Sequence, residues 1–287
     1  MTRHFARPLV LFAAAASSVV LWNSSNCMAD VNLTFFGWSD QHVRTDGSAS
    51  QATLDGIQAM KDLPGKSYPA AIGGTVASPA FVFGAGDITE WPTHAALQTY
   101  KQLQESLGFP TYDVAGNHDD GGLVPSPAVL NWLIEKHGGL SYTFEQGGVH
   151  FVVAWSAFDA AGEPSQPLTD EALNFISTSL AQIPKGAPVI VATHLCFPAI
   201  TNPDALVDSF GDANVIMVMT GQYHQPSVHN YRGIDFVQFP SPESSIHAVT
   251  AVRITNDRLV AIPYNYDTGE WMTGNVVLDK TITVPEP

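Results

Sequence analysis

Residues 111–119 read TYDVAGNHD, an apolar run followed by a glycine and three polar side chains that can carry chemistry. Gly116 permits a sharp turn as the chain leaves a buried strand, so the next side chains can converge on one point. Asn117 offers a neutral oxygen, His118 an imidazole that binds metal or moves a proton, and Asp119 a carboxylate. We interpret this turn as the centre of a site. The alternative is a plain Asx-type turn with a solvated histidine.

Similar donor groups follow other apolar runs of the chain. Asp40 and His42 form an Asp-x-His pair, and side chains two apart in extended backbone point the same way. A single histidine at a strand end is more often a capped or solvated residue than a ligand. Five such ends in order favour one shared site, because open α/β sheets gather ligands at the ends of their strands. The candidates are Asp40 and His42 after residues 31–38, Asp87 after 80–83, Asn117 and His118 after 111–115, His194 after 189–193, and Gln222 and His224 after 215–220.

The hydrophobic pattern between these ends alternates strand with helix. Strands are predicted at 31–38, 80–83 and 111–115, with helices at 51–63 and 93–107, which is typical of a parallel sheet with covering helices. Further on, the pattern predicts a helix at 128–136, a hairpin of 141–144 with 150–155, a helix at 170–182, and buried strands at 189–192 and 215–219. From residue 234 onward we expect only short strands and turns.

Length and charge narrow the class of protein. The chain has 287 residues and a formal net charge of -15, and we expect a single domain over residues 30–287. Because Lys and Arg are scarce, a nucleic-acid polymer or an anionic membrane is not expected as an electrostatic partner. A phosphate substrate remains compatible with this charge, since metal ions at a site override the global field.

The N-terminus has the pattern of a secretory signal peptide. Arg3 and Arg7 precede an apolar stretch at residues 9–22, and a small or polar segment ends at Ala29, where we expect cleavage. An uncleaved anchor is the alternative, although the apolar run is shorter than a membrane span needs. After cleavage we expect a secreted or periplasmic protein with no stable membrane span. Its single cysteine, Cys196, would then form no intramolecular disulfide.

In this order the motifs resemble those of the calcineurin-like metallophosphoesterase family. The ordered set is Asp-x-His, Gly-Asp, Gly-Asn-His-Asp, His and Gly-x-x-His, and it covers residues 31–239. The resemblance implies an α/β fold with two facing mixed β-sheets flanked by helices. It also implies hydrolysis of a phosphate mono- or diester by a hydroxide that two metal ions hold.

The resemblance further assigns a role to each matching residue. It implies that Asp40, His42 and His224 hold one metal, that Asn117 and His194 hold the second, and that Asp87 bridges the two. His118 would lie beside the substrate, with Asp119 as the partner of its ring. His118 could then stabilise the phosphoryl oxygens or protonate the leaving oxygen.

The chemistry of the donors agrees with two transition-metal ions. Mixed carboxylate and imidazole donors suit divalent or trivalent Mn, Fe or Zn rather than calcium. A carboxylate shared by two cations offsets their repulsion, and a water between them becomes a nucleophile near neutral pH.

The last motif departs from the family pattern. The family usually has Gly-His-x-His, whereas here Gln222 stands in place of the first histidine. This position would belong to the metal that Asn117 and His194 hold. A glutamine oxygen can coordinate, but it is a weaker donor towards transition metals than imidazole. We therefore hypothesise that the second ion is held with lower affinity.

The remaining signals bear on the substrate. Purple acid phosphatases have a tyrosine three residues after the bridging aspartate, where this chain has Glu90, so no tyrosinate-to-iron colour is expected. The expected partner is a small-molecule phosphoester, and a nucleotide is one candidate. Trp38 and Trp91 flank two ligand motifs and could stack a base, although packing is the commoner role of such residues. Gln222 keeps a rival hypothesis open, namely a catalytically silent metal-binding protein that recognises a phosphorylated ligand or a protein partner.

Overall fold

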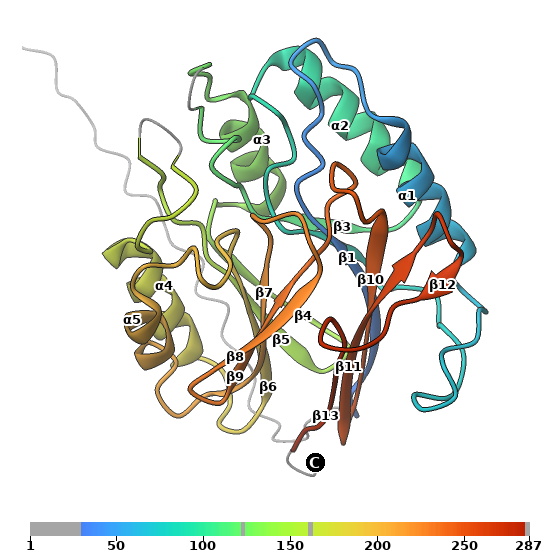
Figure 1. The fold of residues 1–287 in the computed structure, drawn as a ribbon. Coiled ribbons are helices and arrows are strands. Elements are labelled where there is room, and N and C mark those ends of the chain that lie inside the picture. Colours follow the sequence, from blue (N-terminus) through green and yellow to red (C-terminus); the bar gives the residue numbers. More distant parts are fainter. Residues whose placement is uncertain (1–29, 122–123, 160–162, 285–287) are drawn as a thin grey trace, which may run out of the picture.

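The computed structural model describes residues 30–121, 124–159 and 163–284. The predicted signal peptide, residues 1–29, lies outside the described part of the chain. Within it, two β-sheets pack face to face, with helices on the outer side of each (Figure 1). The predicted fold class, two facing mixed sheets flanked by helices, is therefore confirmed. None of the helices in the described part of the chain is long and apolar enough to cross a membrane.

The first sheet combines three parallel strands from the start of the chain with antiparallel strands from its end. Its order is β12-β11-β10-β1-β2-β3, and β13 also pairs with β11. β1 lies parallel to β2 and antiparallel to β10, and β2 lies parallel to β3. The strands are β1 (Asn32–Trp38), β2 (Val82–Gly84), β3 (Thr111–Asp113), β10 (Ala248–Thr255), β11 (Arg258–Asn265), β12 (Glu270–Trp271) and β13 (Leu278–Thr281).

The second sheet has the order β4-β5-β6-β7-β9-β8. Its central strands β5, β6, β7 and β9 run parallel, and antiparallel strands flank them at both edges. The predicted hairpin is β4 with β5, joined at the Gly147-Gly148 turn. The strands are β4 (Tyr142–Gln146), β5 (Val149–Val153), β6 (Pro188–Ala192), β7 (Asn214–Thr220), β8 (Ser227–Tyr231) and β9 (Ile234–Gln238).

Side chains on opposite faces of the strands enter different apolar clusters. In β1, Leu33 and Phe35 lie between the two sheets, whereas Phe36 and Trp38 face the helices. The same alternation holds in β6, where Ile190 faces the first sheet and its neighbours face the helices on the other side. Burial on both faces explains why these strands read as continuous apolar runs, as is usual for parallel strands covered by helices.

Among the described residues five helices cover the sheets, and polar caps mark the starts of three of them. The side chains of Ser50, Thr93 and Thr169 accept backbone N–H groups at the starts of α1, α2 and α4. The helices are α1 (Gln51–Asp62), α2 (His94–Leu107), α3 (Ala128–His137), α4 (Asp170–Leu180) and α5 (Pro203–Asp208). α1, α2 and α3 pack on the first sheet and α4 and α5 on the second (Figure 1). The sequence pattern predicted the first four and missed the six-residue α5.

The expectation of only short strands after residue 234 is wrong. β10 and β11 each span eight residues, and β10 lies beside β1 in the first sheet. They form a hairpin across Asn256-Asp257, a two-residue loop of the kind that joins antiparallel strands. The sequence pattern did not predict β11 as a long strand, because Pro263 lies within it and proline is rare within sheets.

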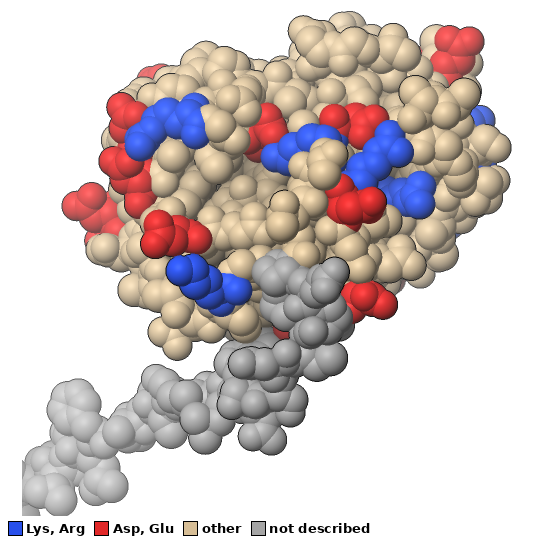
Figure 2. Space-filling model, turned by 90° about the horizontal axis from the view of Figure 1, so that it is seen from below, with Lys and Arg blue, Asp and Glu red and all other residues tan. Residues whose placement is uncertain are grey.

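Basic side chains pair with acidic ones at the lower end of the molecule. Seen from below, Lys and Arg side chains lie beside Asp and Glu (Figure 2). Among the ion pairs are Lys280 with Asp235, and Arg258 with Asp279 at 2.7 Å. On the face that Figure 2 shows, side chains of the two charge signs are thus interspersed.

Candidate metal centre

The predicted ligands lie just beyond the carboxyl ends of parallel strands from both sheets. Asp40 and His42 follow β1, Asp87 follows β2, and Asn117 follows β3 in the first sheet. From the second sheet, His194 follows β6, and Gln222 and His224 follow β7. Because the two sheets pack face to face, these ends meet, and the structure brings together side chains up to 184 positions apart.

One group of donors contains Asp40, His42 and His224. Nε2 of His224 lies 3.4 Å from Oδ1 of Asp40, and Nε2 of His42 lies 3.9 Å from the same oxygen. The two imidazole nitrogens are 3.2 Å apart. Each of the three residues offers one ligand atom, and these atoms lie within 4.8 Å of one another, so one cation could contact all three.

Asp87 lies between this group and a second one. Its Oδ2 is 3.9 Å from Nε2 of His42 and 3.3 Å from Nε2 of His194. The latter nitrogen is also 3.2 Å from Oδ1 of Asn117. Nδ1 of His194 donates to the carbonyl of Ala85 at 2.7 Å, which directs Nε2 towards the carboxylate. This arrangement fits the predicted bridging place of Asp87.

The ionisable side chains at the middle of the centre are buried, and their pKa values shift strongly. Asp40, Asp87 and His194 are at most 1% exposed. Burial would raise the pKa of Asp87, but the neighbouring imidazoles of His194, His42 and His118 hold it well below its usual range. Burial would lower the pKa of His194, but the Asp87 carboxylate raises it to about 10. The carboxylates therefore stabilise positive charge at this point, as a proton or as a metal ion.

The pKa values of the two outer histidines, His42 and His224, shift in opposite directions. Burial lowers the pKa of His42, although Asp87 and Asp40 oppose this effect. The nearby Asp40 carboxylate, whose Oδ1 lies 3.4 Å from Nε2, raises the pKa of His224, which is more exposed. A neutral imidazole is the form that binds metal, so His42 is held in the form that ligation needs.

Backbone hydrogen bonds tie the ligand loops to one another. The N–H of Asp40 donates to Gly86 O at 2.8 Å, and the N–H of His42 donates to Asp87 O at 3.0 Å. The N–H of Gly221 donates to His194 O at 2.8 Å, which joins the loops of the second sheet. The ligand positions are therefore set by the main chain before any ion binds.

The backbone is strained at the ligands themselves. Six non-glycine residues among those described have positive φ, and five of them belong to the predicted metal ligands. Such conformations cost free energy and persist where the surrounding structure enforces them, which is common at functional sites. The five are Asp40, His42, Asp87, Gln222 and His224.

Two glycines give the ligands room. A Cβ at Gly116 would overlap Oδ1 of Asp87, and one at Gly86 would overlap the ring of His194. Gly86 also has φ +98°, a conformation that other residues rarely adopt. Gly116 was expected to permit a sharp turn. Its φ is not positive, and the structure adds a further role, the close approach of the Asp87 carboxylate.

His118 lies beside the metal ligands with its ring held on two sides. Nδ1 is 2.8 Å from the carbonyl oxygen of Glu90, so Nδ1–H donates and Nε2 is left for other chemistry. The indole of Trp91 stacks on the imidazole, and the ring of His42 meets it edge-on at 4.6 Å. The sequence did not reveal the contact with Glu90, because the acceptor is a backbone atom.

The expected pairing of Asp119 with the His118 ring is wrong. The Asp119 carboxylate accepts the N–H groups of Ile88, Thr89 and Gly116 at 3.0–3.1 Å, and the Thr89 hydroxyl at 2.9 Å. It therefore fastens the loop after β2 to the turn after β3. Burial and the nearby Asp87 carboxylate raise the pKa of Asp119 to about 7.

Ser39 and Ser241 are supporting residues that the sequence analysis did not single out. The Ser39 hydroxyl donates to Oδ2 of Asp40, and the Ser241 hydroxyl donates to the Asp40 carbonyl at 2.6 Å. Ser39 directly precedes the Asp-x-His motif, but a serine carries no signal that distinguishes such a role. Together these bonds orient Asp40 so that Oδ1 faces the histidines.

Two buried oxygens of the centre have no hydrogen-bond donor. They are Oδ1 of Asp40 and Oε1 of Gln222. Buried acceptors are nearly always satisfied, so an oxygen left without a donor calls for another partner. Carboxylate and amide oxygens beside imidazole nitrogens are a donor set for divalent transition metals, and the residues present thus fit metal ions.

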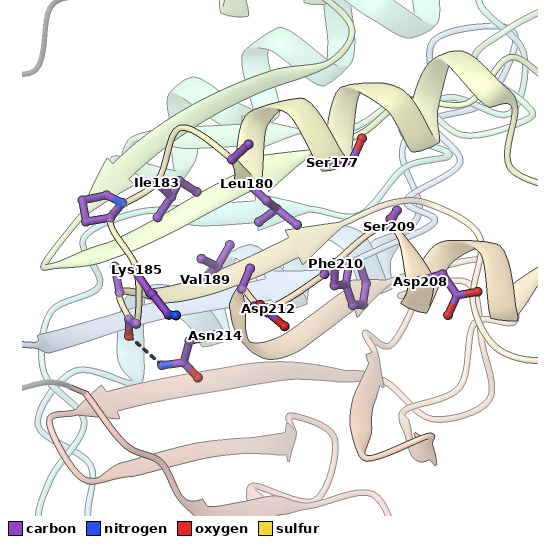
Figure 3. A pocket seen from close by; sticks show the side chains of 16 residues that line it. Ser177, Leu180, Ile183, Lys185, Val189, Asp208, Ser209, Phe210, Asp212 and Asn214 are labelled. Carbon is purple, nitrogen blue, oxygen red and sulfur yellow. Dashed lines mark hydrogen bonds between the residues drawn. The ribbon is translucent and has the colours of Figure 1, made fainter.

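A hollow lies at the end of the second sheet opposite the candidate metal centre. It has a volume of about 450 Å³, with an apolar lining that includes Leu180, Val189 and Phe210 (Figure 3). Asn214, at the start of β7, bonds there to Gly186 O at 2.9 Å. The metal ligands follow the opposite ends of the same strands, so this hollow is separate from the candidate centre.

No protein-family model and no curated protein matches this sequence. Its structure, however, is similar to solved structures. A dimetal phosphatase from Danio rerio has 16% identity and a TM-score of 0.58, with 89% of this chain and 100% of that chain covered. The GAP50 protein of Plasmodium, described as the anchor in the inner membrane complex, has 14% identity and a TM-score of 0.59, covering 89% and 90%.

A putative 5'-nucleotidase from Staphylococcus aureus shares the fold over part of its length. It has 13% identity and a TM-score of 0.52, covering 89% of this chain but only 55% of that chain. At such low identities these similarities show the fold alone. That fold is the one implied by the sequence resemblance, which is confirmed at this level.

Proposed function

We propose that this chain, which has the calcineurin-like metallophosphoesterase fold, is an enzyme that hydrolyses a small-molecule phosphate mono- or diester with the help of two metal ions. The observation that carries the proposal is the convergence of the predicted ligands around Asp87, with His118 beside them. A single structural metal would need neither a bridging carboxylate nor an adjacent imidazole outside the ligand set.

The metal ligands follow from the two donor groups. Asp40, His42 and His224 would hold one cation, and Asn117, His194 and Gln222 the other. Asp87 would contact both. When bound, such cations activate water and neutralise the negative charge of phosphoryl oxygens. Mn, Fe and Zn are the ions that suit mixed oxygen and imidazole donors.

His118 is the catalytic residue of this proposal. Its Nδ1–H is committed to Glu90 O, so Nε2 is the atom that takes up or gives up a proton. In the imidazolium form Nε2–H can donate to a phosphoryl oxygen or protonate the leaving oxygen, which returns the ring to its neutral form. Asp119 supports it only through the backbone of the turn, since its oxygens bind the loop after β2.

The test compares the purified protein with His118→Ala on a chromogenic phosphodiester and a chromogenic phosphomonoester, with Mn²⁺, Fe²⁺ or Zn²⁺ added. We expect turnover by the wild type and a loss of about 100- to 10,000-fold in the variant. Metal content, measured on the same samples, should be equal in both proteins. Equal turnover by the two proteins would contradict the role of His118.

The second candidate function is metal-dependent recognition without catalysis. Gln222 favours it, because this residue replaces an imidazole that the family usually has. The description of GAP50 as an anchor is compatible with a recognition role for this fold. If metal binds but no ester is hydrolysed over a panel of phosphomonoesters, phosphodiesters and ions, recognition is the function.

The proposed place of action is outside the cytoplasm. This part rests on the signal-like pattern of residues 1–29, with cleavage after Ala29. The test is N-terminal analysis of the protein recovered from a secreting host. A mature chain that begins at Asp30 supports export, and an intact N-terminus in the cytoplasmic fraction contradicts it.

A further inference from the structure

We infer that the two cation positions of this centre select different ions: the position that contains Gln222 takes a hard divalent cation such as Mn²⁺ or Mg²⁺ and exchanges it readily, whereas the other retains Zn²⁺ or Fe²⁺. This inference rests on the metal centre of the proposed function. It concerns ion selection, which can be measured without any substrate.

The donor atoms of the two positions differ in kind. The position of Asp40, His42 and His224 has two imidazole nitrogens, and Asp87 adds an oxygen to each position. The other position has a single nitrogen, from His194, beside oxygens from Asn117 and Gln222. Imidazole-rich sets favour Zn and Fe, whereas oxygen-rich sets favour Mn and Mg. The chain therefore has one nitrogen-rich and one oxygen-rich position around a shared carboxylate.

The surroundings of Gln222 fit a ligand. The residue is 8% exposed, and its Oε1 is buried without a hydrogen-bond donor. Its backbone N–H donates to Oδ2 of Asp40 at 3.0 Å, and the N–H of the preceding Gly221 donates to His194 O at 2.8 Å. These two bonds fix Gln222 between a ligand of each position.

The conformation of Gln222 supports the same assignment. Its φ is +83°, which is unfavourable for a residue with a side chain. Gly221 has no room for a Cβ, because Ser39 and Ala85 lie against it. The turn is thus held by its neighbours in a strained form, with its backbone bonded to Asp40 and to the loop of His194. Amide oxygens are among the ligands that hard divalent cations accept.

The experiment measures metal binding to the purified protein after removal of metals by chelation. Zn²⁺ and Mn²⁺ are titrated separately by calorimetry, and metal retained after desalting is measured by elemental analysis. For the wild type we expect one equivalent of Zn²⁺ to survive desalting. A second cation should bind at least tenfold more weakly, and Mn²⁺ should fill this position in the Zn-loaded protein, seen by its electron paramagnetic resonance signal.

The informative variant is Gln222→His, which restores imidazole at the oxygen-rich position. We expect two equivalents of Zn²⁺ to survive desalting in this variant and the Mn²⁺ signal to be lost. The matched control is Gln58→His on α1, an exposed residue that bonds Asp62, which should behave as the wild type. Thermal unfolding of all three proteins verifies that each is folded.

Several outcomes would overturn the inference. Two equivalents of Zn²⁺ retained with equal affinity by the wild type would do so, as would unchanged metal content in Gln222→His. Failure of the proposed function is a different result. If the two ions bind unequally but no phosphoester is turned over, the inference on ion selection holds and the proposed enzymatic function fails. If phosphoesters are turned over by a protein whose two ions bind equally, the proposed function holds and the inference fails.

Discussion

The indole ring of Trp91 stacks on the imidazole of His118, with their centroids 4.6 Å apart and their planes inclined by 30°. Together with the hydrogen bond from Nδ1 to Glu90 O, this contact limits rotation of the imidazole. The direction of Nε2 is thereby fixed relative to Asp87, whose Oδ1 accepts the backbone N–H of His118 at 2.9 Å.

Replacing Trp91 should therefore impair catalysis through the orientation of His118. We expect Trp91→Ala to lower kcat about tenfold, a modest effect compared with loss of the general acid itself, and to leave metal content unchanged. Trp91→Phe keeps an aromatic face and should retain most activity. The measurement is kcat and KM over pH 5–9. A defect in Trp91→Ala that appears only in KM, and only for nucleotides, would instead indicate that the indole stacks on a base.

Replacing Asp119 should destabilise the fold. Its carboxylate accepts four donors in a buried place, and an amide would turn an NH₂ group towards a backbone N–H. We expect Asp119→Asn to lower the free energy of unfolding by about 3 kcal/mol, measured by urea denaturation with chelator present. The neighbouring control is Asp120→Asn, where a half-buried carboxylate accepts one bond from Phe158 N, and its effect should be smaller. Equal stability of Asp119→Asn and wild type would refute the fastening role.

Metal removal should lower stability. The metal-free centre buries two carboxylates, Asp40 and Asp87, whose charge the histidines offset only in part. An ion that binds only the folded chain, at a free concentration of 100 times its dissociation constant, raises the free energy of unfolding by about 2.7 kcal/mol. We therefore expect Mn²⁺ or Zn²⁺ to raise the thermal midpoint and chelator to lower it, whereas Asp87→Ala should make the midpoint insensitive to these ions.

Acid should unfold the protein through a buried carboxylate outside the metal centre, Asp113 on β3. It accepts hydrogen bonds from Tyr100 at 2.7 Å and Lys136 at 2.7 Å. Burial would raise the pKa of Asp113, but Lys136 and His137 hold it well below the value of 3.8 for a free aspartate. The unfolded chain therefore binds a proton at a higher pH than the folded chain does. The stability from this group is present above about pH 4 and is lost as the pH falls further.

The measurement is denaturant unfolding between pH 3 and pH 7. The wild type should lose stability below about pH 4. Asp113→Asn should be less stable at pH 7, because Lys136 then loses its anionic partner. Its stability should also fall less steeply below pH 4. A variant that keeps the full acid dependence of the wild type would show that other carboxylates account for it.

The place of the site was predictable from the sequence because parallel strands end at one edge of a sheet. The order of the motifs placed Asp40, Asp87 and Asn117 at neighbouring ends, and the structure has them there. The contacts around His118 were not predictable in the same way. Its ring binds the carbonyl of Glu90, and a main-chain acceptor leaves no trace in a residue pattern.

The end of the chain was misjudged for a different reason. β10 contains the polar residues Thr250 and Arg253, and β11 contains Pro263, so neither reads as the continuous apolar run by which the other buried strands were found. The two-residue loop at Asn256-Asp257 was the available signal for the hairpin. Likewise, the role of Gly116 depends on where Asp87 lies in space, which only the folded chain determines.

The ligands come from strands of two separate sheets, and this has a consequence for how the protein acquires its ions. Neither sheet alone supplies a full set of donors to the candidate centre, so the complete set exists only when the two sheets are docked against each other.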